Sequence, residues 1–250
     1  MIIKYSATVK SCDSARLYPD LAYPLYSELL GHLLHASFAE KLHETGYTPI
    51  SQYLETVPGD RSRAVWHLSI FGEEAISEFS AAINSLSIIE LEDSGIKLQI
   101  EDISQETPIT HKRLIAAASE IPDSPYWTIK FVTPTSFKSA NRYTLFPSSE
   151  LIIKSLVSKW NNSSSDYTFD DGDALRLLLS SVEISSYRLS SSSFRLKGYN
   201  IRSFVGTLGL TARVAAPLLQ VLKTLLLFGQ YSGIGIKTAL GMGGIKLINF

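Results

Sequence analysis

The side chains best suited to chemistry in this sequence are its histidines, because imidazole can both take up and release a proton near neutral pH. His32 and His35 are three residues apart, a spacing that would place both near one face of a helix. The single cysteine, Cys12, excludes a disulfide framework and a cysteine-rich zinc site, and no third ligand is evident for a metal held by the two histidines. The pattern therefore favours proton transfer over metal binding.

The other histidines differ in their sequence surroundings. His67 alternates with apolar residues, as in a strand, so we expect it to be structural. His111 stands beside Lys112 and Arg113, so we expect it at the surface. His43 follows a run of apolar residues at helical spacing, near the predicted end of a helix.

A second stretch with chemical potential is the glycine-rich segment Tyr231–Gly244, which holds five glycines. Glycine permits positive φ and close backbone approach, so such a loop can present N–H groups to a phosphate. It lacks the Gly-Lys-Ser/Thr step of a P-loop, and an expected strand follows it where a dinucleotide fingerprint would need a helix. The alternative is a tight connection between two packed elements.

The charges are distributed unevenly along a chain whose net charge is −1. Residues 1–100 hold 7 lysines and arginines against 13 acidic residues, whereas residues 151–250 hold 11 against 5. No acidic residue follows Glu183. A region of one sign is suited to docking phosphates, although the same charges could be scattered over several solvated faces.

In the first half, apolar periodicity predicts alternating strands and helices that would position the first histidines. The expected elements are a strand at 2–9, a helix from Pro24 to near Gly46, a strand at 64–71, a helix at 73–86 and one or two strands within 87–103. This order is typical of a ferredoxin-like unit, with helices on one face of an antiparallel sheet.

The same order recurs in the second half. It comprises a strand at 127–132, a helix at 148–160, paired strands at 182–189 and 194–208, a helix at 212–228 and a closing strand at 244–250. The join lies near 106–108. We therefore predict an α+β fold of two tandem ferredoxin-like (RRM-like, βαββαβ) domains, 1–108 and 109–250, the second carrying the C-terminal glycine-rich loop.

The overall composition is that of a folded, soluble, intracellular protein, which we expect to be cytoplasmic. The chain of 250 residues is 45% hydrophobic and 19% charged, which excludes an intrinsically disordered protein. No apolar run approaches the roughly 20 residues that a membrane-spanning helix needs, and the N-terminus lacks a signal-peptide pattern.

Three segments together resemble one protein family. The glycine-rich segment Gly229–Gly243 is similar to the C-terminal signature of the CRISPR repeat-RNA-processing endoribonucleases of the RAMP superfamily. Gly31–Phe38 with Leu42-His43-Glu44 resembles the first helix of that family and the loop after it. Phe131–Phe137 is a weaker match near the start of the second domain. Two ferredoxin-like domains are also what the resemblance implies.

The resemblance implies cleavage of CRISPR precursor RNA within its repeat, without metal or cofactor. The nucleophile would be a 2′-hydroxyl of the RNA, and the products would carry a 2′,3′-cyclic phosphate and a 5′-hydroxyl. His43 corresponds to the catalytic histidine of the family, and a helix C-terminus favours its protonated form. His35 is the candidate for a second proton carrier. Gly31 and Thr48 stand where some members have a tyrosine and a lysine, so Tyr47, Ser51 or a lysine of the second domain would have to substitute.

RNA is expected to lie across the basic second domain, without involvement of a membrane. Tyr199 and Phe204 could stack on bases, although core packing is the commoner use of such residues. Further partners consistent with the resemblance are other CRISPR effector subunits and a second copy of the chain. The rival interpretation is a non-catalytic RNA-binding RAMP subunit of an effector complex, which would have no need of Leu42-His43-Glu44. The expected RNA contacts are Lys138, Arg142, Arg195, Lys197, Arg202, Gly233, Gly235, Lys237, Gly241 and Gly243.

Overall fold

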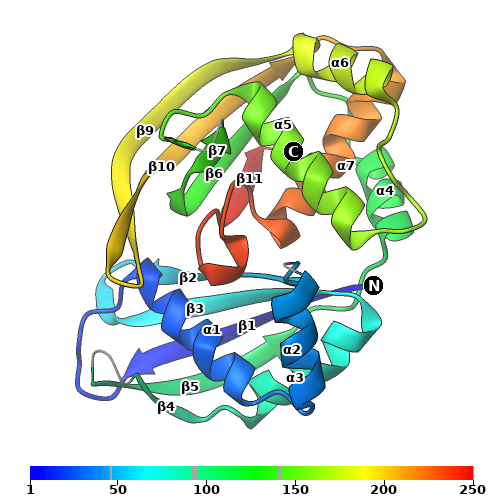
Figure 1. Ribbon diagram of the computed structural model, residues 1–250. Helices are drawn as coiled ribbons and strands as arrows, with labels where there is room; N and C mark the ends of the chain where they lie inside the picture. The colour runs from blue at the N-terminus through cyan, green and yellow to red at the C-terminus, as the bar shows by residue number, and fades with distance from the viewer. Residues whose placement is uncertain (46, 92–94, 140–141, 250) are drawn as a thin grey trace. The chain divides into compact units, whose positions relative to one another are not determined.

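The chain folds into two compact units (Figure 1). The computed structural model describes residues 1–45, 47–91, 95–139 and 142–249, apart from the side chains of residues 43, 45 and 249. The first unit comprises Met1–Pro108 with the short segment Ala239–Gly241, and the second comprises Ile109–Thr238 with Met242–Phe250. Among the described residues, no helix is both long and apolar enough to cross a membrane.

The first unit is built on an antiparallel sheet with the strand order β2-β3-β1-β5-β4. The order β2-β3-β1-β5 is that of a ferredoxin-like unit, and β4 adds an edge strand that pairs with β5. The elements are β1 (Ile2–Ser11), α1 (Ala22–Gly31), α2 (Ala36–Thr45), β2 (Ile50–Val57), β3 (Asp60–Phe71), α3 (Glu73–Ser85), β4 (Ile88–Leu91) and β5 (Ile96–Gln105), with a short 3₁₀ turn at Pro19–Leu21.

Alternation along the central strand β1 builds the core of this unit. Tyr5, Ala7 and Val9 are buried on one face of the sheet, as the two-residue period of a strand requires. Leu25 of α1 and Phe79 of α3 join the same core. The sheet therefore positions α1 and α3, and with them the connection that carries His32 and His35.

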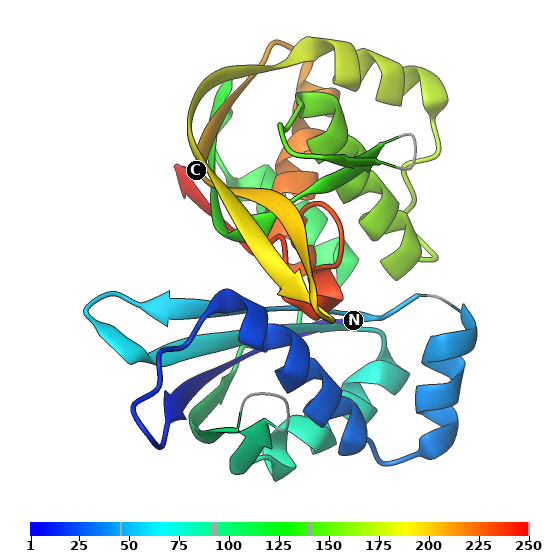
Figure 2. The same cartoon turned by 60° about the vertical axis from the view of Figure 1, so that its left-hand side comes forward.

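The prediction of one helix from Pro24 to near Gly46 is wrong. The structure has two helices, and Figure 2 shows α1 and α2 as separate segments. The buried carboxylate of Glu78 on α3 accepts hydrogen bonds from the backbone N–H groups of Leu34, at 2.9 Å, and His35, at 3.1 Å. Because these donors are satisfied by Glu78, the chain leaves the helix after Gly31 and starts a new one at Ala36.

The second unit repeats the ferredoxin-like order in its sheet, β11-β6-β10-β9, in which all pairs are antiparallel. This confirms the predicted fold class, with longer paired strands than expected and with two helices, α4 and α6, that the sequence patterns do not predict. The elements are α4 (His111–Glu120), β6 (Tyr126–Thr135), β7 (Phe137–Ser139), β8 (Arg142–Thr144), α5 (Ser149–Ser163), α6 (Gly172–Ser181), β9 (Val182–Leu196), β10 (Tyr199–Ala212), α7 (Ala216–Ser232), a 3₁₀ turn at Thr238–Leu240 and β11 (Ile245–Asn249).

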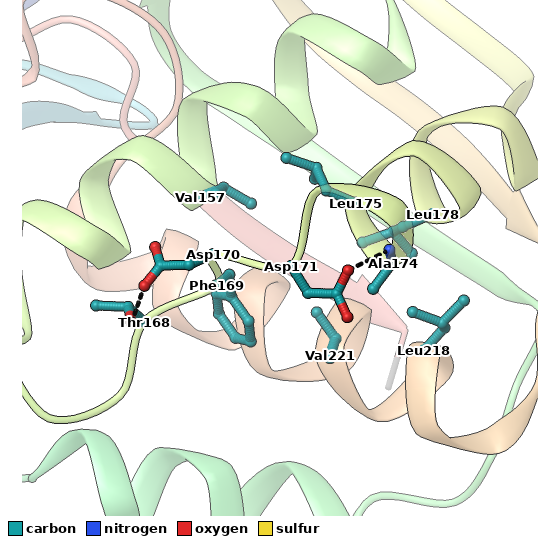
Figure 3. A pocket seen from close by; sticks show the side chains of 10 residues that line it. All are labelled: Val157, Thr168, Phe169, Asp170, Asp171, Ala174, Leu175, Leu178, Leu218 and Val221. Atoms are coloured by element: carbon teal, nitrogen blue, oxygen red, sulfur yellow. Dashed lines mark hydrogen bonds between the residues drawn. The ribbon is translucent and has the colours of Figure 1, made fainter.

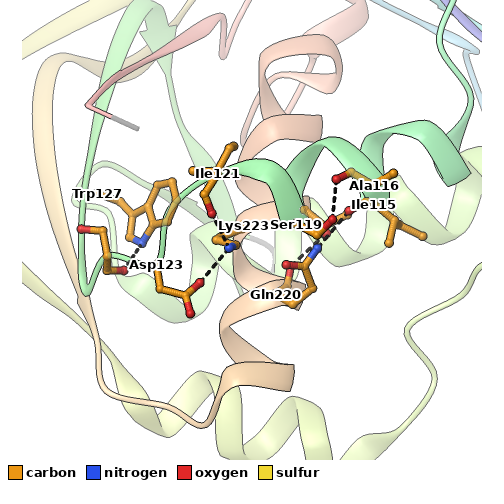
Figure 4. A network of polar contacts seen from close by, with 10 residues as sticks. Ile115, Ala116, Ser119, Ile121, Asp123, Trp127, Gln220 and Lys223 are labelled. Atoms are coloured by element: carbon orange, nitrogen blue, oxygen red, sulfur yellow. Dashed lines mark hydrogen bonds and ion pairs between the residues drawn. The ribbon is translucent and has the colours of Figure 1, made fainter.

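A polar network joins α7 to the α4 region (Figure 4). The Lys223 ammonium is 3% exposed and donates to the carbonyl of Ile121 and to the carboxylate of Asp123, both at 2.8 Å. Gln220 donates to the carbonyl of Ile115 at 2.9 Å. Lys223 counted toward the positive charge of the second half, but its charge is compensated internally and is unavailable to a phosphate.

Candidate functional site

His35 is held by a buried carboxylate at the start of α2. Its Nδ1 hydrogen-bonds to Glu78, while the side chain of His35 is 69% exposed and that of Glu78 only 6%. Burial raises the pKa of Glu78, but the hydrogen bonds from the His35 side chain and from the backbone N–H groups of His35 and Leu34 outweigh burial and lower this pKa below its ordinary value. Glu78 is therefore an ionised acceptor that orients the imidazole.

This arrangement determines which nitrogen of His35 is available. An ionised carboxylate can only accept, so Nδ1 must carry the hydrogen. In the neutral ring Nε2 then has a free lone pair, and no group in the described part of the chain hydrogen-bonds to it. An oriented imidazole with an open Nε2 can take up a proton from a bound substrate.

His32 is not a companion of His35 on a helix face. It follows the last residue of α1, and its Nδ1 lies 3.1 Å from the hydroxyl of Ser85. The prediction of a shared face is wrong because both residues lie in the connection between α1 and α2. Among the described residues, no group of three or more histidine, cysteine or acidic side chains converges as metal ligands would.

The backbone of His43 lies on α2, two residues before its end at Thr45. This is the predicted position near a helix C-terminus. The side chain of His43 lies outside the described residues, so its contacts form no part of the site described above.

The remaining two histidines are structural. His67 is mostly buried, with Nδ1 3.0 Å from the hydroxyl of Ser6 and Nε2 3.2 Å from the Glu55 carboxylate, as predicted for a structural residue. His111 is also buried, and the prediction of a surface position is wrong. Its Nε2 lies 2.9 Å from the hydroxyl of Ser163, and the ring packs edge-on against Trp160. Burial lowers the pKa of His111 to about 4.

The residues considered as substitutes for a missing tyrosine and lysine are poorly suited to act as bases. Burial raises the pKa of Tyr47 to about 12, so its phenol stays protonated. Ser51 is buried on β2.

A group that the sequence did not single out is Lys159 on α5, whose ammonium donates to the hydroxyl of Thr238 at 2.7 Å. Burial lowers the pKa of Lys159 to about 8.

The glycine-rich segment is a tightly packed connection. Gly235 donates to the hydroxyl of Ser155 at 2.8 Å, and Gly243 donates to the carbonyl of Pro134 at 3.1 Å. A Cβ on Gly243 would lie 2.1 Å from the carbonyl oxygen of Ile234, at a φ of +73°. The expectation that Gly233, Gly235 and Gly243 offer their N–H groups to phosphate is therefore wrong, because these donors are used within the protein.

Most of the predicted basic contacts lie on the surface of the second unit. Lys138 and Arg142 belong to the β7–β8 hairpin, and Arg195, Lys197 and Arg202 surround the β9–β10 turn. These five are exposed, whereas Lys237 is half-buried. Phe204 is buried against Phe131 and Phe137, so of its two expected uses it has core packing and not base stacking, while Tyr199 is 46% exposed.

A cavity of about 180 Å³ in the second unit has a different character (Figure 3). It is lined mainly by apolar side chains of α5, α6 and α7, and none of the described residues in its wall is a histidine, lysine or arginine. Its two carboxylates serve the local backbone and side chains, because Asp171 caps α6 and Asp170 accepts from Thr168. This cavity does not suit a nucleic acid.

The sequence similarity to one curated protein is high enough to assign the chain to a family. The CRISPR-associated endoribonuclease Cas6 of Streptococcus thermophilus is 32% identical over 228 residues, which cover 91% of each chain. The chain belongs to the Cas6 family. The family model of the CRISPR-associated endoribonuclease Cas6 matches residues 129–245, and Cas6 of Mycobacterium tuberculosis (strain CDC 1551 / Oshkosh) is 28% identical over 85% of this chain and 67% of its own.

Solved Cas6 structures share the fold. A product complex of Thermus thermophilus Cas6 superposes with a TM-score of 0.83 at 19% identity, covering 99% of this chain and all of the other. The match to the Cas6 family confirms the resemblance drawn from the glycine-rich and histidine segments, and it identifies the chain as a CRISPR-associated endoribonuclease.

Proposed function

We propose that this Cas6 endoribonuclease cuts CRISPR precursor RNA within the repeat by general acid–base catalysis, without a metal ion. A base takes the proton of a 2′-hydroxyl of the RNA, and the 2′-oxygen attacks the adjacent phosphorus. The bond from phosphorus to the 5′-oxygen breaks as an acid protonates that oxygen. The products carry a 2′,3′-cyclic phosphate and a 5′-hydroxyl, and the RNA itself supplies the nucleophile.

Two histidines of the first unit are assigned to the proton transfers. His35 acts as the base through Nε2, and the observation that carries this assignment is the hydrogen bond from its Nδ1 to the buried, ionised Glu78. His43 acts as the acid, supported by its position near the C-terminus of α2, where the helix dipole favours an imidazolium.

The RNA is held by the second unit. Lys138, Arg142, Arg195 and Arg202 are exposed, and none of them forms an ion pair with a carboxylate in the described part of the chain. Uncompensated surface cations are what a sequence-independent phosphate contact requires. Lys197, Lys237 and the backbone of Gly241 complete the proposed contacts. The RNA partner in this proposal is CRISPR repeat RNA. Whether two copies of the chain associate is tested by sedimentation with and without RNA.

The test is incubation with the repeat RNA of the host locus in excess EDTA, followed by analysis of the RNA ends. Cleavage at one site within the repeat, with a cyclic phosphate and a 5′-hydroxyl, is the expected result. A repeat with deoxyribose before the cut must stay intact. Binding of every repeat without cleavage would instead identify a non-catalytic RNA-binding subunit, and activity that requires an added divalent ion would exclude the proposed mechanism.

A further inference from the structure

Phe146 and Tyr187 form an aromatic pair on the surface of the second unit. Their ring centroids are 5.7 Å apart and the ring planes meet at 89°. Phe146 is nevertheless 59% exposed and Tyr187 63% exposed. Tyr143 and Leu145, just before Phe146 in the chain, are 48% and 40% exposed. Grouped exposed apolar side chains mark a binding surface more often than single ones do.

Regular structure holds Tyr187 and follows shortly after Phe146. Phe146 stands just before the capped start of α5, where the hydroxyl of Ser148 accepts the N–H of Leu151 at 3.1 Å. Tyr187 lies within the long strand β9 and pairs with Leu208 of β10. Because Tyr187 is held within a strand and Phe146 shortly precedes a capped helix, ordering the two rings on binding would cost little conformational entropy.

The β7–β8 hairpin before Phe146 is anchored to the same two-stranded ribbon, β9–β10. The ring of Phe137 on β7 stacks on Phe204 of β10, with centroids 6.2 Å apart and an interplanar angle of 24°. Two ring contacts, Phe137 with Phe204 and Phe146 with Tyr187, therefore join β7 and the segment just after β8 to the ribbon. The aromatic pair and the hairpin belong to one surface.

The charge around the pair indicates the kind of partner. Lys138 lies opposite Tyr143 in the hairpin, so the two side chains share one face of it. Lys138 is exposed and forms no ion pair with a carboxylate of the described residues. From residue 184 to the end of β10 the sequence has no acidic residue. Open aromatic rings and an uncompensated cation are the two features that bind single-stranded nucleic acid, by stacking and by phosphate contact.

We propose that Phe146 and Tyr187 form a stacking site for unpaired bases of single-stranded RNA, with Lys138 contacting a phosphate beside it. The proposal adds a base-binding subsite to the RNA surface of the proposed function, and it rests on that function for the identity of the natural RNA. Stacking needs a ring face and no particular base edge, so this subsite does not discriminate strongly among the bases.

The test measures fluorescence anisotropy with two labelled probes of about 12 units, an oligoadenylate and a ribose-phosphate chain of the same length without bases. Phe146→Leu and Tyr187→Leu keep an apolar side chain but remove the ring. Each should weaken oligoadenylate binding about 5- to 100-fold, the range for loss of one base–aromatic stack. Binding of the abasic chain should change less than about 2-fold, because the phosphate contacts remain.

Tyr126→Leu is the matched control, since Tyr126 belongs to the same unit and is also 63% exposed. This variant should bind both probes like the wild type. Wild-type oligoadenylate affinity in both ring variants would overturn the proposal, and so would an equal loss for the abasic chain. A loss of self-association with RNA binding intact would show a protein contact and would also overturn it.

The tests of the proposed function and of the stacking site can fail independently of each other. If the chain binds repeat RNA without cutting it, the proposed function fails while the effect of the ring variants on oligoadenylate still decides the stacking site. If the chain cuts its repeat and the ring variants bind oligoadenylate normally, only the stacking site is wrong.

Discussion

Glu78 on α3 hydrogen-bonds to Nδ1 of His35, 43 positions earlier in the chain, and also accepts the backbone N–H of the same residue. The Glu78 carboxylate thus binds backbone N–H groups in the connection between α1 and α2. It also orients the imidazole of His35. Because these two roles share one side chain, the local fold and the candidate chemistry can be separated only by variants that keep one role and remove the other.

Glu78→Gln is such a variant. A glutamine oxygen can still accept the N–H groups of Leu34 and His35, but its amide cannot act as an ionised acceptor for Nδ1. We expect near-wild-type thermal stability with a single-turnover rate at least about 10-fold lower, and a shifted pH–rate profile. Glu78→Ala removes both roles and should lower stability as well. An unchanged rate and profile in Glu78→Gln would show that Glu78 serves the fold alone.

His43→Ala should bind repeat RNA nearly as well as the wild type and cut it at least about 100-fold more slowly, since loss of one proton-transfer group typically costs about 10²–10⁴-fold. His35→Ala should also slow cleavage. His32→Ala is the matched control, because His32 lies in the same region but contacts Ser85. Single-turnover rates at saturating protein measure the effect of each of the three substitutions. A wild-type rate in His43→Ala would transfer the acid role to another residue.

Reversing Arg195 and Lys197 to glutamate should weaken RNA binding and flatten its salt dependence. Each lost phosphate contact lowers the slope of log K against log salt by about 0.7 for single-stranded nucleic acid. The reversal of Lys4 and Lys10, in the acidic first half, should have little effect. Binding titrations at several salt concentrations test this, and the opposite ranking would place the RNA surface on the first unit.

His111 should make the protein sensitive to mild acid. Its folded pKa of about 4 lies below the ordinary value of 6.5, so the unfolded chain binds the proton first. Stability is then complete above pH 6.5 and falls as the pH drops from 6.5 toward 4, by about 2 kcal/mol between pH 7 and 5. Urea unfolding at the two pH values should show a smaller loss in His111→Gln. An equal loss in both proteins would assign the sensitivity to other groups.

The order of strands and helices follows from local patterns, whereas the details of the site depend on contacts between distant residues. The strand β2 was not predicted because residues 50–54 are all buried without alternation. Its buried Gln52 accepts the indole N–H of Trp66 at 2.7 Å and donates to the carbonyl of Ala22 at 2.7 Å. The helix break at His32–His35 depends on Glu78, and the burial of His111 depends on Trp160 and Ser163. No periodicity near these residues reveals such partners.

The glycine-rich segment was recognised by its residues, yet the role of its glycines is steric, and substitution can measure that role. Gly243→Ala would place a methyl group 2.1 Å from the carbonyl oxygen of Ile234 at a φ of +73°. Gly198→Ala imposes a similar φ of +83°, and no atom of the described residues lies within 4 Å of the added Cβ, so this variant isolates the conformational cost. That cost is about 1–2 kcal/mol for a non-glycine residue in the left-handed region. Gly243→Ala should lose more than Gly198→Ala, because the segment must also move to relieve the clash. Denaturant unfolding of both variants measures the difference, and equal losses would mean that the backbone around Ile234 yields at no cost.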